Sequence, residues 1–136
     1  MNIKKYIFSI KGEILMNQIH LPHNHGENEA DILALASNIQ DFQTTAELFQ
    51  QLSDGTRIRL FWILCHCEEC VINLSAIMEM SSPAISHHLK LLKSAGLIVS
   101  RREGKEVYYK AANTHQVSIL HDMLETLLSI NCPKNK

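Results

Sequence analysis

Apolar residues recur every three or four positions along most of this chain, which is the spacing of amphipathic helices. In the N-terminal part this spacing predicts one helix over Ala30–Ile39 and a second helix that Thr44 or Thr45 caps. The segment Ser53–Thr56 combines serine, aspartate, glycine and threonine, and it breaks the pattern. The first third of the folded region is therefore expected to be helical.

The same reasoning predicts three more helices in the middle of the chain. A strongly apolar helix begins at Asp54 or Thr56 and is expected to fray near Cys67–Glu69. Asn73 is expected to cap a short helix over Leu74–Met80. A tight turn then leads into a helix over Pro83–Ser94, because proline at the first helical position gives up no hydrogen bond. Gly96 is placed to end that helix.

Two short β-favouring runs follow, at Leu97–Arg101 and Glu106–Lys110, and the glycine-containing segment between them predicts a hairpin. Asn113 is expected to cap a last helix that ends near Ile130. The predicted fold is therefore mainly α with a small β-hairpin. Two helices joined by a tight turn and followed by a hairpin are the order of a winged helix-turn-helix.

Composition divides the chain into three parts. Residues 1–29 are predicted to be a flexible arm, residues 30–131 the winged helix-turn-helix domain, and residues 132–136 a tail. Lys11–Glu13 back-translates to a purine-rich stretch just before the codon of Met16, as a bacterial ribosome-binding site would. The hypothesis is that residues 1–15 are not native and that Met16, rather than Met1, is the true start.

Charge is distributed unevenly. The net charge of −1 alone argues against a nucleic-acid partner, since such domains are usually basic. However, residues 17–56 contain six acidic and no basic residues, whereas residues 82–110 contain six basic and two acidic residues. A local excess of positive charge is what contact with phosphates requires. The charge pattern therefore leaves double-stranded DNA open as a partner.

Three of the four cysteines, Cys65, Cys67 and Cys70, fall within six residues, and Cys132 lies near the C-terminus. No secretion signal and no membrane-length apolar run are evident, so the chain is expected in the cytoplasm, where thiols stay reduced. Clustered thiols there favour a metal or redox site. Thiolates suit zinc, cadmium, lead and copper ions, and three thiolates suit trivalent arsenic. The helix must end within this stretch for the sulfurs to converge.

Several segments together resemble the ArsR/SmtB-type metalloregulators, a family of bacterial winged-helix repressors. The matching segments are Leu52–Leu60 (LSDGTRIRL), Cys70–Leu74 (CVINL), Ser82–Leu92 (SPAISHHLKLL), Ala95–Ile98 (AGLI) and Arg101–Tyr109 (RREGKEVYY). The resemblance implies a homodimer that represses an operator and an inducer that weakens its binding to DNA. An enzyme with a cysteine nucleophile and a histidine base is not expected, because no orienting third residue and no glycine-rich oxyanion turn are evident in the sequence.

The candidate DNA-contacting residues lie on the second helix of the motif and on the wing. Hydroxyl, imidazole and amino groups suit phosphates and base edges, and arginine and lysine at a wing tip suit the DNA backbone. These candidates are Ser82, Ser86, His87, Lys90, Arg101, Arg102 and Lys105. His88 lies nearer the buried side, and an internal hydrogen bond is an equal alternative for it.

The resemblance also bears on the sensing site. Arsenic sensors of the family use the spacing C-x-C-x-x-C, which Cys65, Cys67 and Cys70 reproduce about five residues earlier. Cadmium and lead sensors add ligands from the N-terminal arm, where this chain has His23 and His25.

The family's zinc site on the last helix is only half present in this chain. Asn113 and His115 occupy the positions of its first ligand pair, but Thr126 and Ser129 replace the second pair. The other polar side chains of this helix are then expected to be solvated, namely His115, His121, Asp122 and Glu125.

The sequence therefore predicts a homodimeric repressor of an operator, with no membrane association. Its inducer is expected to be a thiophilic ion (zinc, cadmium, lead, copper or As(III)) bound by Cys65, Cys67 and Cys70, with His23 and His25 as further candidate ligands. Cys132 could join the site, pair by oxidation or play no part. The alternative is a repressor that is switched by cysteine oxidation or persulfidation.

Overall fold

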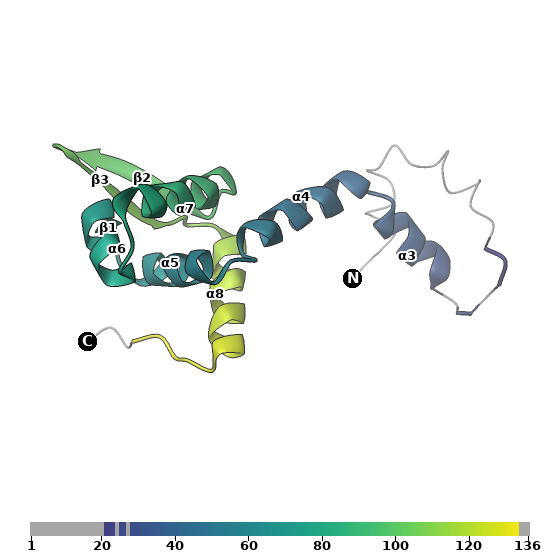
Figure 1. Ribbon diagram of the computed structural model, residues 1–136. Coiled ribbons are helices and arrows are strands. Elements are labelled where there is room, and N and C mark those ends of the chain that lie inside the picture. Colours follow the sequence, from purple (N-terminus) through teal and green to yellow (C-terminus); the bar gives the residue numbers. More distant parts are fainter. Residues whose placement is uncertain (1–20, 24, 27, 134–136) are drawn as a thin grey trace. The chain divides into compact units, whose positions relative to one another are not determined.

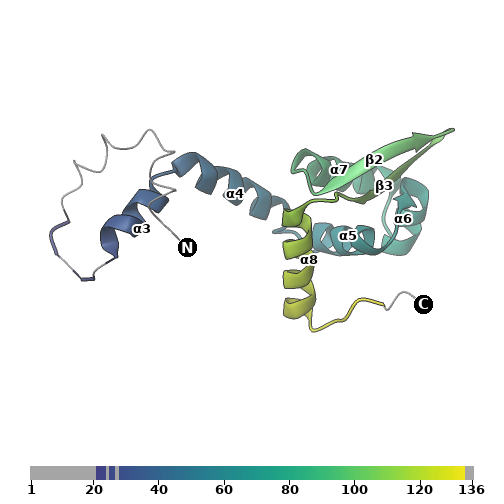
Figure 2. The ribbon, with the colours of Figure 1, turned by 180° about the vertical axis from the view of Figure 1, so that it is seen from behind.

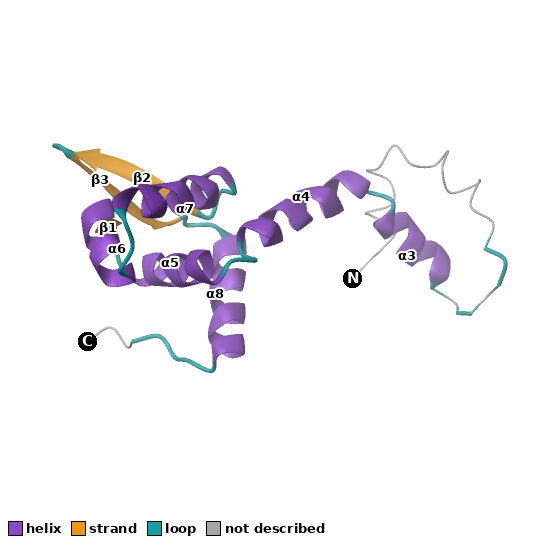
Figure 3. Cartoon of the chain, viewed as in Figure 1, coloured by secondary structure: helices purple, strands orange, loops and turns teal. Residues whose placement is uncertain are grey.

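The computed structural model describes residues 21–23, 25–26 and 28–133. The hypothesis about Met16, and the part of the predicted arm before residue 21, lie outside the described residues. Figures 1 and 3 show that the described chain is mostly helical, with one small sheet. The elements are α3 Glu29–Ala36, α4 Ile39–Gln51, α5 Gly55–His66, β1 Glu69–Cys70, α6 Val71–Met78, α7 Ser82–Ser94, β2 Ile98–Glu103, β3 Glu106–Ala111 and α8 His115–Leu128.

The chain divides into two compact units, Met1–Ala46 and Glu47–Lys136. The first contains α3 and the start of α4, and the second contains the whole sheet and helices α5 to α8. The domain boundaries predicted from composition, at residues 29 and 131, remain predictions. No helix within the described residues is both long and apolar enough to span a bilayer.

Helix α5 begins and ends where its sequence predicts. Asp54 is the N-cap, and its carboxylate accepts a hydrogen bond of 3.0 Å from the backbone N–H of Arg57. That bond is the main reason why the pKa of Asp54 is lowered. The helix stops at His66, because Cys67 adopts an extended conformation with φ −148°. The predicted fraying near Cys67 is therefore confirmed.

Three predicted caps are wrong. Helix α4 begins at Ile39 and continues through Thr44 and Thr45, and the Thr45 hydroxyl donates to the carbonyl of Asp41 inside the helix. Helix α6 begins at Val71, so Asn73 lies within it and donates its amide to the Glu69 carboxylate at 2.8 Å.

In the last helix the cap is displaced by a single residue. Thr114, not Asn113, caps α8, and its hydroxyl accepts a hydrogen bond from the N–H of Val117 at 3.2 Å. Asparagine and threonine are both residue types that cap helices, so the sequence alone does not separate two such neighbours.

The three strands form an antiparallel sheet in the order β1-β3-β2. The predicted hairpin is confirmed, with Glu103 opposite Glu106 and Gly104 at φ +60° in the turn, a backbone conformation that favours glycine. Strand β1, only two residues long, pairs Cys70 with Tyr108 and was not predicted, because two residues carry no periodic signal.

The core lies where α5, α6, α7 and α8 meet the sheet. Its fully buried side chains are Leu60, Phe61, Leu64, Leu74, Ile85, Leu89, Leu92, Leu97 and Ile98. Helix α7 follows α6 and precedes the hairpin, and Figure 2 shows this order from behind. The chain therefore has the predicted winged helix-turn-helix fold, mainly α with a small hairpin.

Candidate nucleic-acid interface and metal centre

Helix α7 presents a polar face because its apolar face is fixed in the core. The Ser81 side chain accepts a hydrogen bond from the N–H of Ala84, and Pro83 occupies the first turn. Ile85, Leu89 and Leu92 are completely buried. The predicted DNA-contacting residues of this helix are all exposed, and they are Ser82, Ser86, His87 and Lys90. The structure thus leaves this set available to a macromolecular partner.

His88 takes the second of its two predicted roles. Its ring is half-buried, and Nδ1 lies 3.3 Å from Nη1 of Arg57. Arg57 is itself held by a hydrogen bond of 2.6 Å from Nε to the carbonyl oxygen of Gln51. These bonds join α7 to the N-terminal turn of α5, so His88 contributes to the position of α7 rather than to its exposed face.

The three basic residues predicted on the wing are in different situations. Arg101 donates to Oε1 of Glu68 from Nε at 2.9 Å and from Nη2 at 2.6 Å, and its guanidinium lies 4.8 Å from the centre of the Tyr108 ring. It also pairs with Glu103. Lys105 is exposed at the turn.

The ion pair between Arg101 and Glu68 shifts the pKa of both residues. The hydrogen bond from Arg101 lowers the pKa of Glu68, and the same bond raises the pKa of Arg101. Arg102, next along the wing, donates from Nε to the carbonyl of Gly104 at 3.2 Å. The Arg101 side chain is therefore held on the protein, whereas Lys105 projects from the wing.

The structure does not gather the predicted thiol site. Cys65 is half-buried against the core, Cys67 is exposed at the C-cap of α5, and Cys70 is buried with 8% of its surface accessible. Among the described residues, these three sulfurs do not form a group that could share one ion. Burial, followed by the neighbouring charges of Cys132 and Glu125, raises the pKa of Cys65 to about 12. The ligand set predicted from the C-x-C-x-x-C spacing therefore stays a prediction.

His23 and His25 belong to the unit Met1–Ala46 and are both exposed. Their ring centres lie 5.7 Å apart. The backbone N–H of His25 donates to Glu29 at 2.7 Å, which places the residue just before α3. No structural observation links these two side chains to the cysteines, and their role as ligands also stays a prediction.

A different group of metal-ligating side chains is brought together, namely His66, His121, Glu125 and Cys132. His66 is the last residue of α5, and Cys132, in the segment after α8, reaches it with its sulfur. Figure 1 shows that this segment continues from the end of α8 to the C-terminus. The expectation that His121 and Glu125 are solvated is wrong. Only 18% of the His121 side chain and 16% of the Glu125 side chain are accessible.

The ligand atoms of this group, which we call the His66 cluster, lie within hydrogen-bonding distance of one another. Nε2 of His121 is 3.2 Å from Nε2 of His66, 3.1 Å from Sγ of Cys132 and 3.0 Å from Oε1 of Glu125. Nε2 of His66 is 3.7 Å from Sγ of Cys132 and 3.5 Å from Oε1 of Glu125. The Cys132 thiol donates a short hydrogen bond to the same carboxylate oxygen.

Two pKa shifts follow from the contact between Cys132 and Glu125. Their hydrogen bond raises the pKa of Cys132 to about 11, and it is the main cause that lowers the pKa of Glu125. The thiol is therefore protonated at neutral pH while the carboxylate is ionised. Sequence reasoning missed His66 entirely. The one available signal was the i, i+4 spacing of His121 and Glu125, which puts both on one face of a helix.

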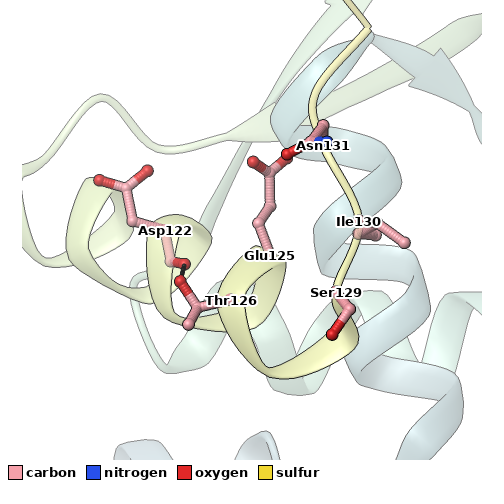
Figure 4. A pocket seen from close by; sticks show the side chains of 6 residues that line it. All are labelled: Asp122, Glu125, Thr126, Ser129, Ile130 and Asn131. Carbon is pink, nitrogen blue, oxygen red and sulfur yellow. Dashed lines mark hydrogen bonds between the residues drawn. The ribbon is translucent and has the colours of Figure 1, made fainter.

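Glu125 also borders a hollow at the surface between the end of α8 and the C-terminal segment. Figure 4 shows its lining residues: Asp122, Glu125, Thr126, Ser129, Ile130 and Asn131. The hollow opens to solvent on one side of Glu125.

The winged helix-turn-helix fold and the exposed face of α7 define a class of DNA-binding regulators. The pattern of the bacterial regulatory proteins of the arsR family matches residues 54–100. A transcriptional repressor SmtB homolog of Synechocystis is 34% identical over 78% of this chain and 80% of its own length. The arsenic resistance regulator ArsR2 of Pseudomonas putida is 38% identical over 65% of this chain and 76% of its own length.

A solved structure supports the fold. The homodimeric winged helix-turn-helix domain of a possible ArsR-family regulator from Mycobacterium bovis is similar with a TM-score of 0.62 and 22% identity, covering 83% of this chain and 97% of that one. This chain belongs to the ArsR family of bacterial regulatory proteins. It is a DNA-binding transcription regulator and not an enzyme.

Proposed function

We propose that this chain is a repressor that binds a double-stranded DNA operator and releases it when a thiophilic metal or metalloid ion binds. The observation that carries the proposal is the exposed polar face of α7, fixed by Ile85, Leu89 and Leu92 beside the wing. The names of its relatives, a repressor SmtB homolog and an arsenic resistance regulator, support the response to an ion. Such a protein acts in the cytoplasm, where the chromosome lies.

The proposed repressor is a homodimer. Large apolar side chains of α8 remain exposed, with 53% of Ile119 and 72% of Leu127 accessible. Phe42 and Phe49 of α4 are likewise 60% and 50% exposed. Exposed apolar patches are typical of protein interfaces, and the similar domain from Mycobacterium bovis is a homodimer. Two copies would place two α7 helices on one operator.

Switching by cysteine oxidation or persulfidation, the alternative, is disfavoured by the thiols themselves. The reactive form of cysteine is the thiolate. The pKa is raised to about 12 for Cys65 by burial and to about 11 for Cys132 by its bond to Glu125, and burial also raises it for Cys67. These three thiols are therefore protonated, and slow to react, at neutral pH.

The direct test is operator binding by the reduced full-length protein with DNA from upstream of its own gene. Fluorescence anisotropy would be followed while zinc, cadmium, lead, copper(I) or arsenite is added under anaerobic conditions. We expect at least one ion to weaken binding by about 5- to 150-fold, the usual range of allosteric coupling. No binding at low salt, or release by oxidant alone, would contradict the proposal.

Lys105 is the wing residue best placed to contact the DNA backbone. Lys105→Ala should weaken binding to the operator and to random duplex DNA by the same factor. Loss of one phosphate contact should also reduce the slope of log K against log salt concentration by about one. A loss confined to the operator would show instead that Lys105 reads bases.

Glu68 competes with DNA for Arg101. Glu68→Gln removes one of the two carboxylates that hold the guanidinium, Glu103 being the other, so Arg101 is released more easily to phosphates. We expect tighter binding to random duplex DNA and a salt slope steeper by about one. The double variant Glu68→Gln/Arg101→Ala should not bind random duplex DNA more tightly than the parent chain. If it does, the effect of Glu68→Gln arises from lost repulsion between Glu68 and DNA.

A further inference from the structure

We propose that His66, His121, Glu125 and Cys132 form a metal site for one zinc ion, or a divalent ion of similar size and softness. The inference depends on the proposed function only for the regulatory role of the ion, since binding itself can be measured without DNA. All four residues lie in the unit Glu47–Lys136 and come from α5, α8 and the C-terminal segment. They are not the cysteines that the sequence pattern favours.

The spacing of the four ligand atoms in the His66 cluster matches a tetrahedral coordination shell. Zinc binds nitrogen and oxygen at about 2.0–2.2 Å and sulfur at about 2.3 Å, so the edges of the tetrahedron are about 3.3–3.8 Å long. The distances among His66, His121, Glu125 and Cys132 run from 3.0 to 3.7 Å, apart from the short thiol–carboxylate bond. An ion at the centre therefore requires only small movements of these side chains.

Hydrogen bonds alone cannot account for all the close contacts in the His66 cluster. Each of the four ligand atoms can supply at most one proton. Four protons at most therefore serve six close contacts among these atoms. One cation at the centre faces all four lone pairs at once. This arrangement favours a bound ion over a network of hydrogen bonds.

A second layer of side chains orients the ligands. Nδ1 of His121 lies 3.1 Å from Oδ1 of Asp122, so it donates its proton there and leaves the Nε2 lone pair for an ion. A carboxylate on the far nitrogen of a ligating histidine is a recurrent feature of zinc sites.

Trp62 supports the other histidine. Its ring centre lies 4.5 Å from that of His66, and its buried Nε1 has no hydrogen-bond partner among the described residues. Because Trp62 is the only tryptophan of the chain, it reports directly on His66.

The chemical types of the four ligand atoms determine which ion they bind best. One sulfur, two imidazole nitrogens and one carboxylate oxygen suit zinc, with cobalt(II) and cadmium as replacements. Trivalent arsenic requires three thiolates, and the His66 cluster supplies one sulfur, that of Cys132. We therefore expect zinc to bind and arsenite not to bind.

The test is a titration of the reduced, tag-free full chain with cobalt(II) and then zinc. We expect one cobalt ion per chain, with visible d–d bands of tetrahedral intensity and a thiolate charge-transfer band. Zinc should displace cobalt with loss of these bands. Cobalt should quench Trp62 fluorescence in the same titration. At a zinc concentration 100 times Kd, the melting temperature should rise by about 10 °C.

Matched variants identify the ligands. Cys132→Ser should remove the charge-transfer band and His121→Ala should lower affinity by 10-fold or more, whereas Cys67→Ser, His115→Ala and the pair His23→Ala/His25→Ala should behave like the parent chain. A band that survives Cys132→Ser or disappears in Cys67→Ser overturns the assignment, and so does loss of binding in the His23/His25 variant. If cobalt is bound by Cys132 and His121 while none of zinc, cadmium, lead, copper(I) and arsenite weakens operator binding, the site stands and the proposed function fails.

Discussion

Cys132→Ser should bind the operator as tightly as the parent chain without added ion, and zinc should no longer weaken that binding. Serine keeps the size and the hydrogen bond to Glu125 but removes the sulfur ligand of the His66 cluster. The ratio of operator affinities without and with zinc should fall from about 5–150 to about 1. Fluorescence anisotropy with a labelled operator measures both affinities. This is the largest functional effect that we expect of a single substitution.

The physical basis is the place of the His66 cluster between α8 and the end of α5. Helix α5 packs against α7 and the sheet, so a bond between His66 and the C-terminal segment restrains the element on which the DNA-contacting helix rests. Cys67→Ser is the matched control, one residue beyond His66, and it should keep the full response to zinc. If zinc no longer weakens operator binding by Cys67→Ser, the sensing role belongs to the cysteines of the C-x-C-x-x-C spacing instead.

Leu89→Ala should strongly destabilise the fold. Leu89 is completely buried where α7 meets the core. Loss of a buried leucine side chain costs about 2–5 kcal/mol, through lost transfer energy and the cavity left behind. Urea unfolding followed by circular dichroism should show this loss, together with a melting temperature lower by about 10 °C or more.

Ser86→Ala, on the opposite face of the same helix, is the control. It should change the free energy of unfolding by less than about 0.5 kcal/mol and yet weaken operator binding. Equal stability losses in the two variants would show that α7 does not rest on the core through Leu89. Unchanged operator affinity in Ser86→Ala would remove that hydroxyl from the contact set.

The fold was predictable because its signals are local. The apolar spacing of α5 and α7, the proline at the start of α7 and the glycine of the hairpin each act within a few residues. The errors lie where several polar residues compete for one role. Thr45 and Asn73 could each cap a helix, but their side chains bond to Asp41 and Glu69 instead.

The site was less predictable because its parts meet only in the folded chain. The spacing of Cys65, Cys67 and Cys70 is visible in the sequence, yet α5 ends at His66 and leaves their sulfurs apart. His66 and Cys132 are 66 positions apart, and only the path of the C-terminal segment joins them. Because Thr126 and Ser129 stand where the family has its second pair of zinc ligands, His121 and Glu125 were predicted to be solvated surface residues.

X-ray absorption at the zinc edge of the full chain with one equivalent of zinc tests the central claim most directly. The spectrum reports the atoms around the ion without any assumption about which residues supply them. The His66 cluster predicts a first shell of one sulfur at about 2.3 Å and three nitrogen or oxygen atoms at about 2.0–2.2 Å. A shell of three sulfurs, or one without sulfur, would contradict it.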